Sequence, residues 1–352
     1  MCDSNDHAHG DDVRATMPRA MEGDAVDPIS LEPVDEVTVT TLVDNSYDGL
    51  MGDMGPARRA PMARTKRVPA PQFLQGETVG GLVAEHGFAA LVTIRRGSTS
   101  HTLLFDTGVS PNGLADNLER LGLDSSAIEA VILSHGHFDH AGGFPGLARL
   151  RRRHGLPLTL HPLVWTKRRV TFPGGQWELP ALSRQSLEDE GFDVVERRQP
   201  SLLLDGSILV TGEVDRTTDF ETGMKFHEAE GDHGWEPDPL ILDDQALVVH
   251  VRDRGLAVLT GCGHAGAVNI CRYAQRLTRV DRLAGLFGGF HLTGPGFEPV
   301  IEPTVTALRD LGPAVVLPAH CTGWRAHHRL AAELPEAYIP NAVGTTVTIA
   351  AA

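Results

Sequence analysis

Two patterns of apolar and polar residues recur along this chain and predict its secondary structure. Runs of mostly apolar, often β-branched residues are typical of buried strands. Apolar residues three or four positions apart, such as Leu114, Leu118 and Leu121, predict helices with one buried face. We predict strands at 36–45, 88–96, 101–108, 127–134, 245–251, 256–261, 283–289, 314–320 and 344–350, and helices at 112–123, 265–277 and 302–311.

This order of buried strands and amphipathic helices indicates an α/β domain in which helices cover the faces of a sheet. Residues 1–34 are rich in Asp, Pro, Gly and Met without periodicity, and we expect a disordered acidic leader there. The remaining residues, 35–352, are predicted to form a single domain. Two stretches within it read as long loops: a Gly/Pro/Arg-rich insertion at about 46–73, and an acidic segment at 219–244.

Charge and cysteine content exclude several functions. The formal net charge of −15 and the pI near 5.5 argue against binding to the phosphates of DNA or RNA. Four scattered cysteines without a CxxC pair predict reduced thiols. There is neither an apolar run long enough for a membrane span nor a signal-peptide pattern at the N-terminus. We therefore expect a cytoplasmic protein that acts on a small, anionic molecule, without nucleic-acid or membrane partners; its oligomeric state stays open.

The stretch "LSHGHFDHAGG", residues 133–143, carries the strongest chemical signal. His135, His137, Asp139 and His140 follow directly after an apolar strand, on a turn that can fold several side chains toward one point. Imidazole and carboxylate groups together suit zinc, iron or manganese. The alternative is a cluster of surface histidines, but four coordinating residues at the end of a strand favour a metal site.

This motif resembles the HxHxDH signature of the metallo-β-lactamase fold superfamily. The resemblance implies a four-layer αββα sandwich with a one- or two-metal site at the sheet edges. It assigns His135 and His137 to the first metal, and Asp139 and His140 to the second. Further motifs, "TLVDN", "AEHGFAALV", "LLFDTG", "DDQAL", "LTGCGHAGAVNI", "GGFHL" and "AHCTG", are similar to a dihydropteroate-synthase-like branch of this superfamily, the 7,8-dihydropterin-6-methyl-4-(β-D-ribofuranosyl)-aminobenzene-5′-phosphate synthases.

The same resemblance assigns roles to residues at other strand ends. It implies His264 as the third histidine of the first site and His320 as the last ligand of the second. Asp106 would lie behind the ligand turn and orient its histidines; an ordinary turn-forming aspartate is the alternative. Most of the superfamily has an aspartate between the two metals where this chain has Cys262. Cys262 is either a ligand or a small buried core residue, which leaves the number of metals open.

Three further residues are weaker candidates. His291 follows two glycines and is a ligand, a catalytic hydrogen-bond donor to substrate or a packed core histidine. His86 either lines the pocket or is structural. Arg216 contacts a substrate phosphate, or it forms a local ion pair with Glu213 or Glu221.

Three functions fit these residues. The closer resemblance implies a transferase that joins a dihydropterin methyl diphosphate to an aminobenzene ribofuranosyl phosphate. The residues themselves fit a metallohydrolase acting on a phosphoester, lactone or thioester, with Asp139 both ligating and steering the nucleophile. The third is an iron-binding redox protein. The expected cofactor is two divalent ions, zinc before iron or manganese, with a single ion as the alternative.

Overall fold

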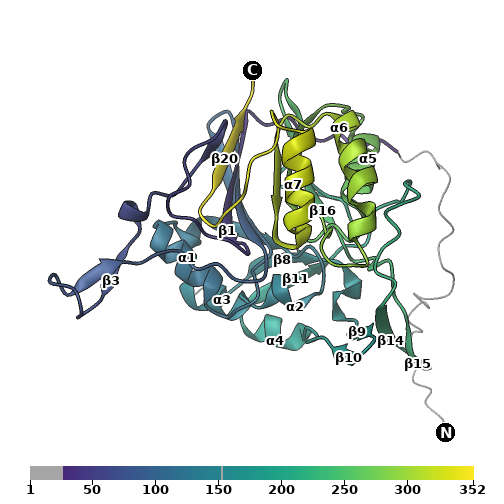
Figure 1. The fold of residues 1–352 in the computed structure, drawn as a ribbon, viewed down its shortest axis with the longest axis horizontal. Helices are drawn as coiled ribbons and strands as arrows, with labels where there is room; N and C mark the ends of the chain where they lie inside the picture. Colours follow the sequence, from purple (N-terminus) through teal and green to yellow (C-terminus); the bar gives the residue numbers. More distant parts are fainter. Residues whose placement is uncertain (1–26, 152–153) are drawn as a thin grey trace, which may run out of the picture.

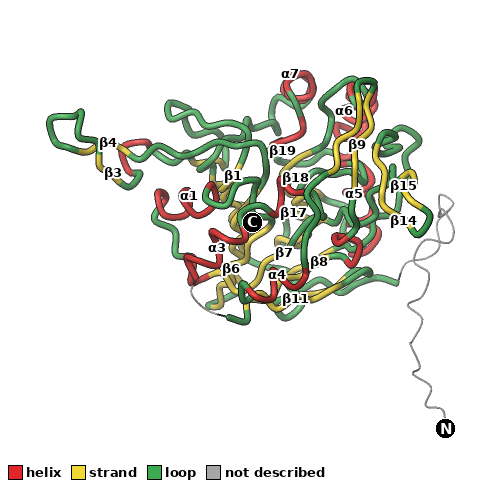
Figure 2. Tube along the Cα trace, turned by 90° about the horizontal axis from the view of Figure 1, so that it is seen from below, coloured by secondary structure: helices red, strands yellow, loops and turns green. Residues whose placement is uncertain are grey.

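Two large β-sheets pack face to face at the centre of the molecule, and helices cover the outer face of each (Figures 1 and 2). The computed structural model describes residues 27–151 and 154–352. The arrangement is the expected four-layer αββα sandwich, and every strand and helix predicted from the apolar pattern is present within a few residues of its expected bounds.

The first sheet has eight strands in the order β11-β8-β7-β6-β5-β1-β20-β2. Strands β6, β7, β8 and β11 are parallel, so their carboxyl ends lie at one edge, while β1, β5, β20 and β2 pair antiparallel. Its strands are β1 (Glu36–Val43), β2 (Ala57–Arg58), β5 (Ala89–Arg96), β6 (Thr99–Phe105), β7 (Ile128–Ile132), β8 (Leu156–Leu160), β11 (Phe192–Glu196) and β20 (Thr346–Ala350).

The second sheet has six strands in the order β12-β13-β16-β17-β18-β19. Its last three strands are parallel, and helices connect them. The strands are β12 (Ser201–Leu203), β13 (Ile208–Val210), β16 (Ala246–Val251), β17 (Gly255–Thr260), β18 (Leu283–Gly289) and β19 (Val316–Ala319).

The helices form the two outer layers. Apolar side chains of α1, α3 and α4 pack on the eight-stranded sheet, and those of α5, α6 and α7 pack on the six-stranded sheet (Figure 1). The bounds are α1 (Gly113–Leu121), α2 (Phe138–Ala141), α3 (Phe144–Arg151), α4 (Arg184–Asp189), α5 (Ala267–Thr278), α6 (Ile301–Leu311) and α7 (Trp324–Glu333). Short 3-10 helices lie at Met62–Arg64, Ser125–Ala127, Pro162–Trp165, Glu298–Val300 and His320–Thr322.

A third apolar core fills the space between the two sheets. Fully buried Phe105 and Ile132 of the first sheet face Phe287 and Leu247 of the second. Burying such side chains stabilises the fold by about 1.5–3 kcal/mol for each one. The rigid sandwich that results holds the strand ends, and the residues that follow them, in fixed positions.

The boundary predicted for the acidic leader is wrong at its carboxyl end. Residues 1–26 lie outside the described residues, but Leu31 is buried in the core beneath α5, and the Ile29 amide donates to the Leu277 carbonyl. Val34 bridges Val251, the last residue of β16 in the second sheet. The last residues of the predicted leader therefore belong to the domain, because their apolar side chains fill space beside the six-stranded sheet.

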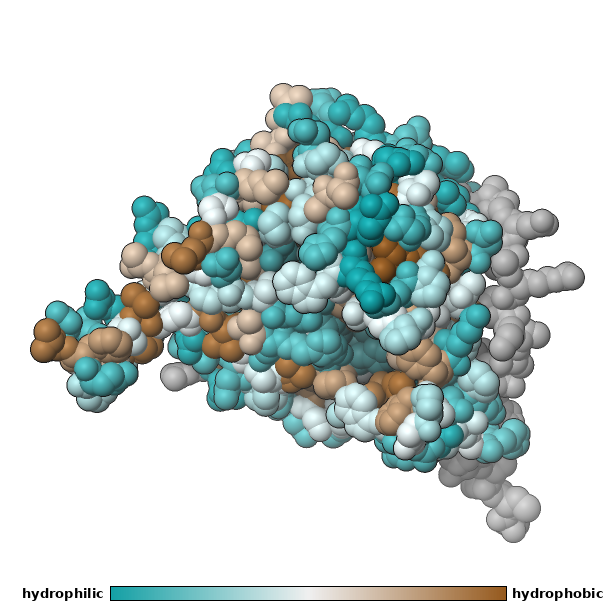
Figure 3. Space-filling view, in the orientation of Figure 1, coloured by the Kyte–Doolittle hydropathy of each residue, from teal (hydrophilic) through white to brown (hydrophobic). Residues whose placement is uncertain are grey.

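The insertion predicted as a loop at 46–73 contains regular structure. β2 pairs with β20, and β3 (Arg67–Pro69) pairs with β4 (Glu77–Val79) in a hairpin that projects from the body as an arm (Figure 1). Phe73 and Leu74 at the tip of the arm are exposed, and apolar side chains are visible there in Figure 3. The arm therefore extends the insertion beyond residue 73.

The acidic segment 219–244 is also not a continuous loop. It contributes β14 (His227–Gly231) and β15 (Gly234–Pro237) to a four-stranded sheet of order β10-β9-β14-β15, with β9 at Arg168–Phe172 and β10 at Gly175–Glu178. These strands are short and polar and pair with a hairpin about sixty residues earlier, so the apolar pattern did not reveal them.

One buried amide fastens the end of the insertion to the sandwich. The Asn117 side chain on α1 accepts from the Val83 amide and donates to the carbonyls of Leu42 and Val83, each at 2.8 Å. Asn117 is fully buried, so water cannot replace these bonds.

We expect Asn117→Ala to lower the free energy of unfolding by roughly 2–4 kcal/mol, because it leaves buried backbone groups without partners. The measurement is urea denaturation followed by circular dichroism. Asn112→Ala is the matched control: Asn112 is exposed at the start of the same helix, and its loss should change stability by less than about 0.5 kcal/mol. Equal stability of the two variants would contradict this account of Asn117.

Candidate metal centre

The candidate ligands gather at one end of the sandwich because they follow the carboxyl ends of parallel strands. The turn with His135 and His137 follows β7, and the loop with His264 follows β17. His291 and His320 follow β18 and β19. Parallel neighbours end at the same sheet edge, so residues distant in sequence meet there.

The first cluster consists of three buried histidines. The ring atoms His135 Nε2 and His137 Nδ1 are 3.0 Å apart, and His264 Nε2 is 3.2 Å from each of them. These three nitrogens converge on a single point, as a set of metal ligands would.

Hydrogen bonds on the outer side of two rings fix which nitrogen carries the proton. The Ser134 hydroxyl donates to Asp106, so His135 Nδ1 is the donor to Ser134 Oγ, at 2.9 Å. His227 Nδ1 donates to the Asp238 carbonyl, so His227 Nε2 accepts from His137 Nε2, at 3.0 Å. The inner nitrogens of His135 and His137 therefore both carry lone pairs.

Two lone pairs 3.0 Å apart repel each other unless a cation lies between them. Burial lowers the pKa values of His135, His137 and His264 well below the usual range, which keeps the three rings neutral. Nitrogen ligands about 2.0–2.1 Å from a tetrahedral zinc ion are roughly 3.3 Å apart. The donor type, spacing and tautomers of this cluster thus fit a divalent metal.

The second cluster combines Asp139, His140, Cys262 and His320, all buried. Asp139 Oδ2 lies 3.2 Å from His320 Nε2 and 3.9 Å from His140 Nε2. His140 Nε2 lies 3.2 Å from Cys262 Sγ. Carboxylate, imidazole and thiol groups at these separations also suit zinc or iron.

Outer hydrogen bonds orient the histidines of this cluster too. His140 Nδ1 lies 2.7 Å from Asp106 Oδ2, and His320 Nδ1 lies 3.1 Å from Asn45 Oδ1. Because both oxygens are acceptors, both Nε2 atoms face the cluster, and His320 Nε2 has no hydrogen-bond partner.

The protonation of His140 reflects its neighbouring carboxylates. Burial alone would lower the pKa of His140, but Asp106 and Asp139 outweigh it and raise the pKa to about 9. A metal ion bound at Nε2 would take the place of that proton.

Asp106 holds the ligand turn from behind. Its carboxylate accepts from the Ser134 amide and hydroxyl and from His140, each at 2.7 Å. Asp106 is fully buried and has a left-handed φ of 59°, a conformation that aspartate tolerates better than most residues. A Cβ at Gly261 would lie 2.7 Å from Asp106 Oδ2, so the close approach of β17 to the turn requires glycine.

Cys262 lies between the two clusters. Its sulfur belongs to the second set of donors and also lies near His264 and His291. Burial raises the pKa of the Cys262 thiol, so a metal would have to displace the thiol proton before the sulfur could ligate. Cys321 Sγ is 3.4 Å from Cys262 Sγ and is absent from the described donor clusters.

His291 and His86 flank the two clusters. The His291 ring packs between those of His264 and Phe297, with centroids 4.4 Å from each, and its buried Nδ1 atom has no partner. His86 is exposed, and its Nε2 atom lies 3.5 Å from Asp139 Oδ2.

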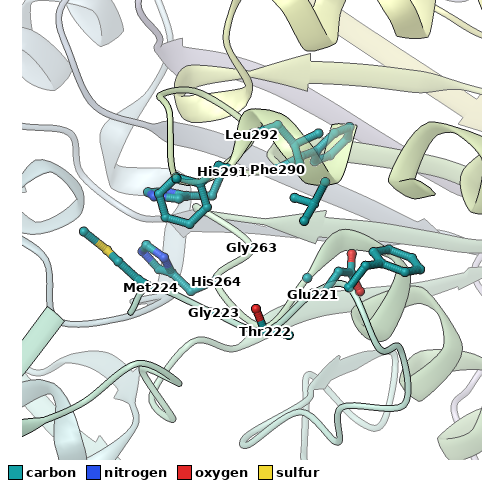
Figure 4. Close-up of a pocket in the computed structure, with 14 residues that line it drawn as sticks. Glu221, Thr222, Gly223, Met224, Gly263, His264, Phe290, His291 and Leu292 are labelled. Atoms are coloured by element: carbon teal, nitrogen blue, oxygen red, sulfur yellow. The ribbon is translucent and has the colours of Figure 1, made fainter. Parts of the chain in front are cut away.

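A cavity opens beside His264 and His291 (Figure 4). Figure 4 shows both imidazoles near Met224, with Phe290 and Leu292 from the same loop as His291. The other walls come from residues 220–224 and 296–300. A mostly apolar cavity next to candidate metal ligands is suited to binding a small molecule.

The structure shows what Arg216 contacts. Its guanidinium donates to the carbonyls of His264 and Leu240, while its buried Nε atom has no partner, so the contact with a substrate phosphate stays a prediction. The expected alternative, a direct ion pair with Glu213 or Glu221, is not among the salt bridges of the described residues. Arg216 instead supports the loop that carries His264.

Sequence reasoning missed His227, and it included Asp243 only within the motif "DDQAL". His227 is fully buried and touches the outer nitrogen of His137, yet in the sequence it is a single histidine in an acidic stretch. Asp243 accepts from the Gly136 amide inside the ligand turn, at 2.8 Å, and pairs with buried Arg168. The Arg168 guanidinium holds the pKa of Asp243 down at about 2 although burial alone would raise it.

Removing one inner nitrogen tests the first cluster. We expect His137→Ala to lower bound metal per chain to half the wild-type value or less, measured by plasma mass spectrometry after dialysis against metal-free buffer. His328→Ala is the control, because His328 is exposed on α7. Full metal content in the His137→Ala protein would overturn the assignment of His137.

The orienting role of Asp106 is tested by Asp106→Asn, which keeps the size and tolerates the backbone conformation. An amide at this position cannot accept all three hydrogen bonds, so we expect metal affinity to fall about 10- to 100-fold. Competition with a chromophoric chelator measures the affinity. Asp116→Asn on α1 is the control and should bind metal with wild-type affinity. Wild-type metal affinity in the Asp106→Asn protein would contradict the orienting role of the Asp106 carboxylate.

Comparison with known proteins identifies relatives of this chain. The chain is 27% identical over 262 residues to 7,8-dihydropterin-6-methyl-4-(β-D-ribofuranosyl)-aminobenzene-5′-phosphate synthase of Methanocaldococcus jannaschii. The aligned region covers 72% of this chain and 86% of that protein. An uncharacterized protein of the same organism is 27% identical over 252 residues. That alignment covers 70% of this chain and 88% of the uncharacterized protein.

Among solved structures, Tm1679, described as a metal-dependent hydrolase of the β-lactamase superfamily, has a similar fold. Its TM-score is 0.64 at 23% identity, and the match covers 89% of this chain and 99% of Tm1679. The family model of the metallo-β-lactamase superfamily matches residues 85–276, more than half of the 352-residue chain. The chain therefore belongs to the metallo-β-lactamase superfamily.

Proposed function

We propose that this protein is a metal-dependent enzyme that joins a dihydropterin methyl diphosphate to an aminobenzene ribofuranosyl phosphate and releases diphosphate. The observation that carries the metal requirement is the pair of buried clusters whose ring nitrogens face inward at the spacing of metal ligands. The choice of reaction draws on the relative from Methanocaldococcus jannaschii, which bears that synthase name and aligns with 72% of the chain.

The proposed metal ligands divide between the two clusters. His135, His137 and His264 would hold one divalent ion, and Asp139, His140 and His320, with Cys262 between the clusters, would hold a second. Such ions supply Lewis-acid stabilisation of a departing diphosphate or of a polarised oxygen. Zinc is the proposed metal because imidazole, thiol and carboxylate groups are its usual ligands.

Asp139 and His291 are the proposed catalytic residues. The Asp139 carboxylate lies between His320 and the exposed His86, so it reaches from the second cluster toward solvent. Burial alone would raise the pKa of Asp139, but the neighbouring histidines hold it well below its usual range, so the group stays an acceptor. His291 lines the cavity and its buried Nδ1 atom has no partner, so this ring is the proposed hydrogen-bonding group for a bound substrate.

One observation favours the hydrolytic alternative. Among the described residues that line the cavity beside His264 there is no lysine or arginine, so a neutral lactone or thioester would also be accepted there. In that reaction Asp139 would steer a water molecule instead of assisting an amine.

The experiment that separates these reactions is an assay of diphosphate release by the metal-loaded protein. We expect diphosphate only when the dihydropterin methyl diphosphate and the aminobenzene ribofuranosyl phosphate are both present, because the amine is the nucleophile. His328→Ala should retain this activity and His137→Ala should lose it.

Two results would contradict the proposed reaction. Cleavage of a lactone, thioester or phosphodiester in the absence of the arylamine, without any coupling, would establish the hydrolase instead. Stoichiometric iron with a visible absorption band, and no turnover of either kind, would favour the iron-binding redox alternative.

A further inference from the structure

The four-stranded sheet turns one face toward the metal centre. Trp177 on β10 pairs with Val170 on β9, and Val170 pairs with His227 on β14. Residues paired across neighbouring strands point to the same face, so these three side chains lie in a row. His227 at one end contacts His137, whereas Trp177 at the other end is 50% exposed.

Two more aromatic rings extend this row. Phe138 follows His137 directly, and its ring lies edge-to-face with Trp177 at a centroid distance of 5.4 Å. Phe172 is two residues from Val170 on β9, so it shares the same face, and it is 49% exposed. We call Phe138, Phe172 and Trp177 the aromatic shelf.

The shelf lies within reach of the candidate ligands. Neighbouring strands are about 4.8 Å apart, so the Trp177 backbone is roughly 10 Å from that of His227. Phe138 is flanked in the chain by His137 and Asp139, one from each cluster. A flat molecule of two fused rings that lies on the shelf can therefore place a substituent at the metal centre.

The charge of this face defines what it can bind. Arg168 also points to this face, but it is buried and paired with Asp238 and Asp243. The described residues of this face include no unpaired lysine or arginine side chain, so the face has no cation with which to bind a phosphate. The exposed aromatic rings offer stacking to a neutral planar molecule.

We propose that the aromatic shelf binds the dihydropterin ring of the substrate by stacking, with the diphosphate-bearing methylene directed toward the metal clusters. The pterin suits an open shelf because its polar edges stay in water while its faces are covered. The mostly apolar cavity beside His264 would cover more of those edges. This inference rests on the proposed function, since it assigns one of the two substrates to a place.

The test is equilibrium binding of 6-hydroxymethyl-7,8-dihydropterin to the metal-loaded full chain by titration calorimetry. We expect Trp177→Leu to weaken binding roughly tenfold, because one stacking partner is lost, and Trp177→Phe to restore most of the affinity. Trp324→Leu is the matched control: Trp324 is 82% exposed at the start of α7, outside the four-stranded sheet, and its loss should leave affinity unchanged.

The shelf would be overturned if Trp177→Leu bound the pterin like wild type with normal metal content, or if the wild-type protein did not bind it. Turnover separates this inference from the proposed reaction. Pterin binding that depends on Trp177, without diphosphate release when the arylamine is added, would support the shelf and refute the synthase. Coupling with a KM for the pterin substrate that is unchanged in Trp177→Leu would support the synthase and refute the shelf.

Discussion

The candidate centre depends above all on the hydrogen bonds that its histidines donate away from the site. Each bond holds one N–H of a ring outside and turns the other ring nitrogen toward the site, where it can ligate a metal ion once it carries no proton. Asp106 is central because it fixes His140 directly and His135 through Ser134. The same carboxylate therefore serves both clusters, which couples the orientation of one set of ligands to the other.

Holding these polar groups in a dry interior has a free-energy cost, and hydrogen bonds and ion pairs around the ligands offset part of it. The Arg168–Asp243 ion pair is buried, which costs free energy of desolvation. The Asp243 carboxylate also accepts a hydrogen bond from the Gly136 amide, so the pair holds the turn that carries His135 and His137 in place. Backbone strain is present here as well: Asp106, His291 and His320 all have left-handed φ values. Non-glycine residues keep such angles only where many surrounding contacts fix the backbone, and the apolar core between the sheets supplies that rigidity.

The four-stranded sheet adds what the sandwich alone lacks. It brings His227 to the outer nitrogen of His137 and carries the exposed rings of Phe172 and Trp177 out from the same face. One small element thus connects support for the first cluster with a surface where a planar molecule can rest. The cavity beside His291 is formed by different residues, so two separate surfaces adjoin one centre, an arrangement suited to a reaction between two ring-bearing substrates.

The sequence by itself determined nine strands of the two large sheets, the helices α1, α5 and α6 and the ligand turn, because apolar runs and the spacing of His135 to His140 are local signals. Resemblance to the superfamily then supplied His264 and His320, which share no local pattern with that turn. Only the tertiary structure revealed His227, the support given by Arg216 and the arm at residues 67–79, and placed Cys262 between the clusters. These features depend on which strands pair and which loops pack together, and such contacts between distant residues leave little trace in the order of neighbouring amino acids.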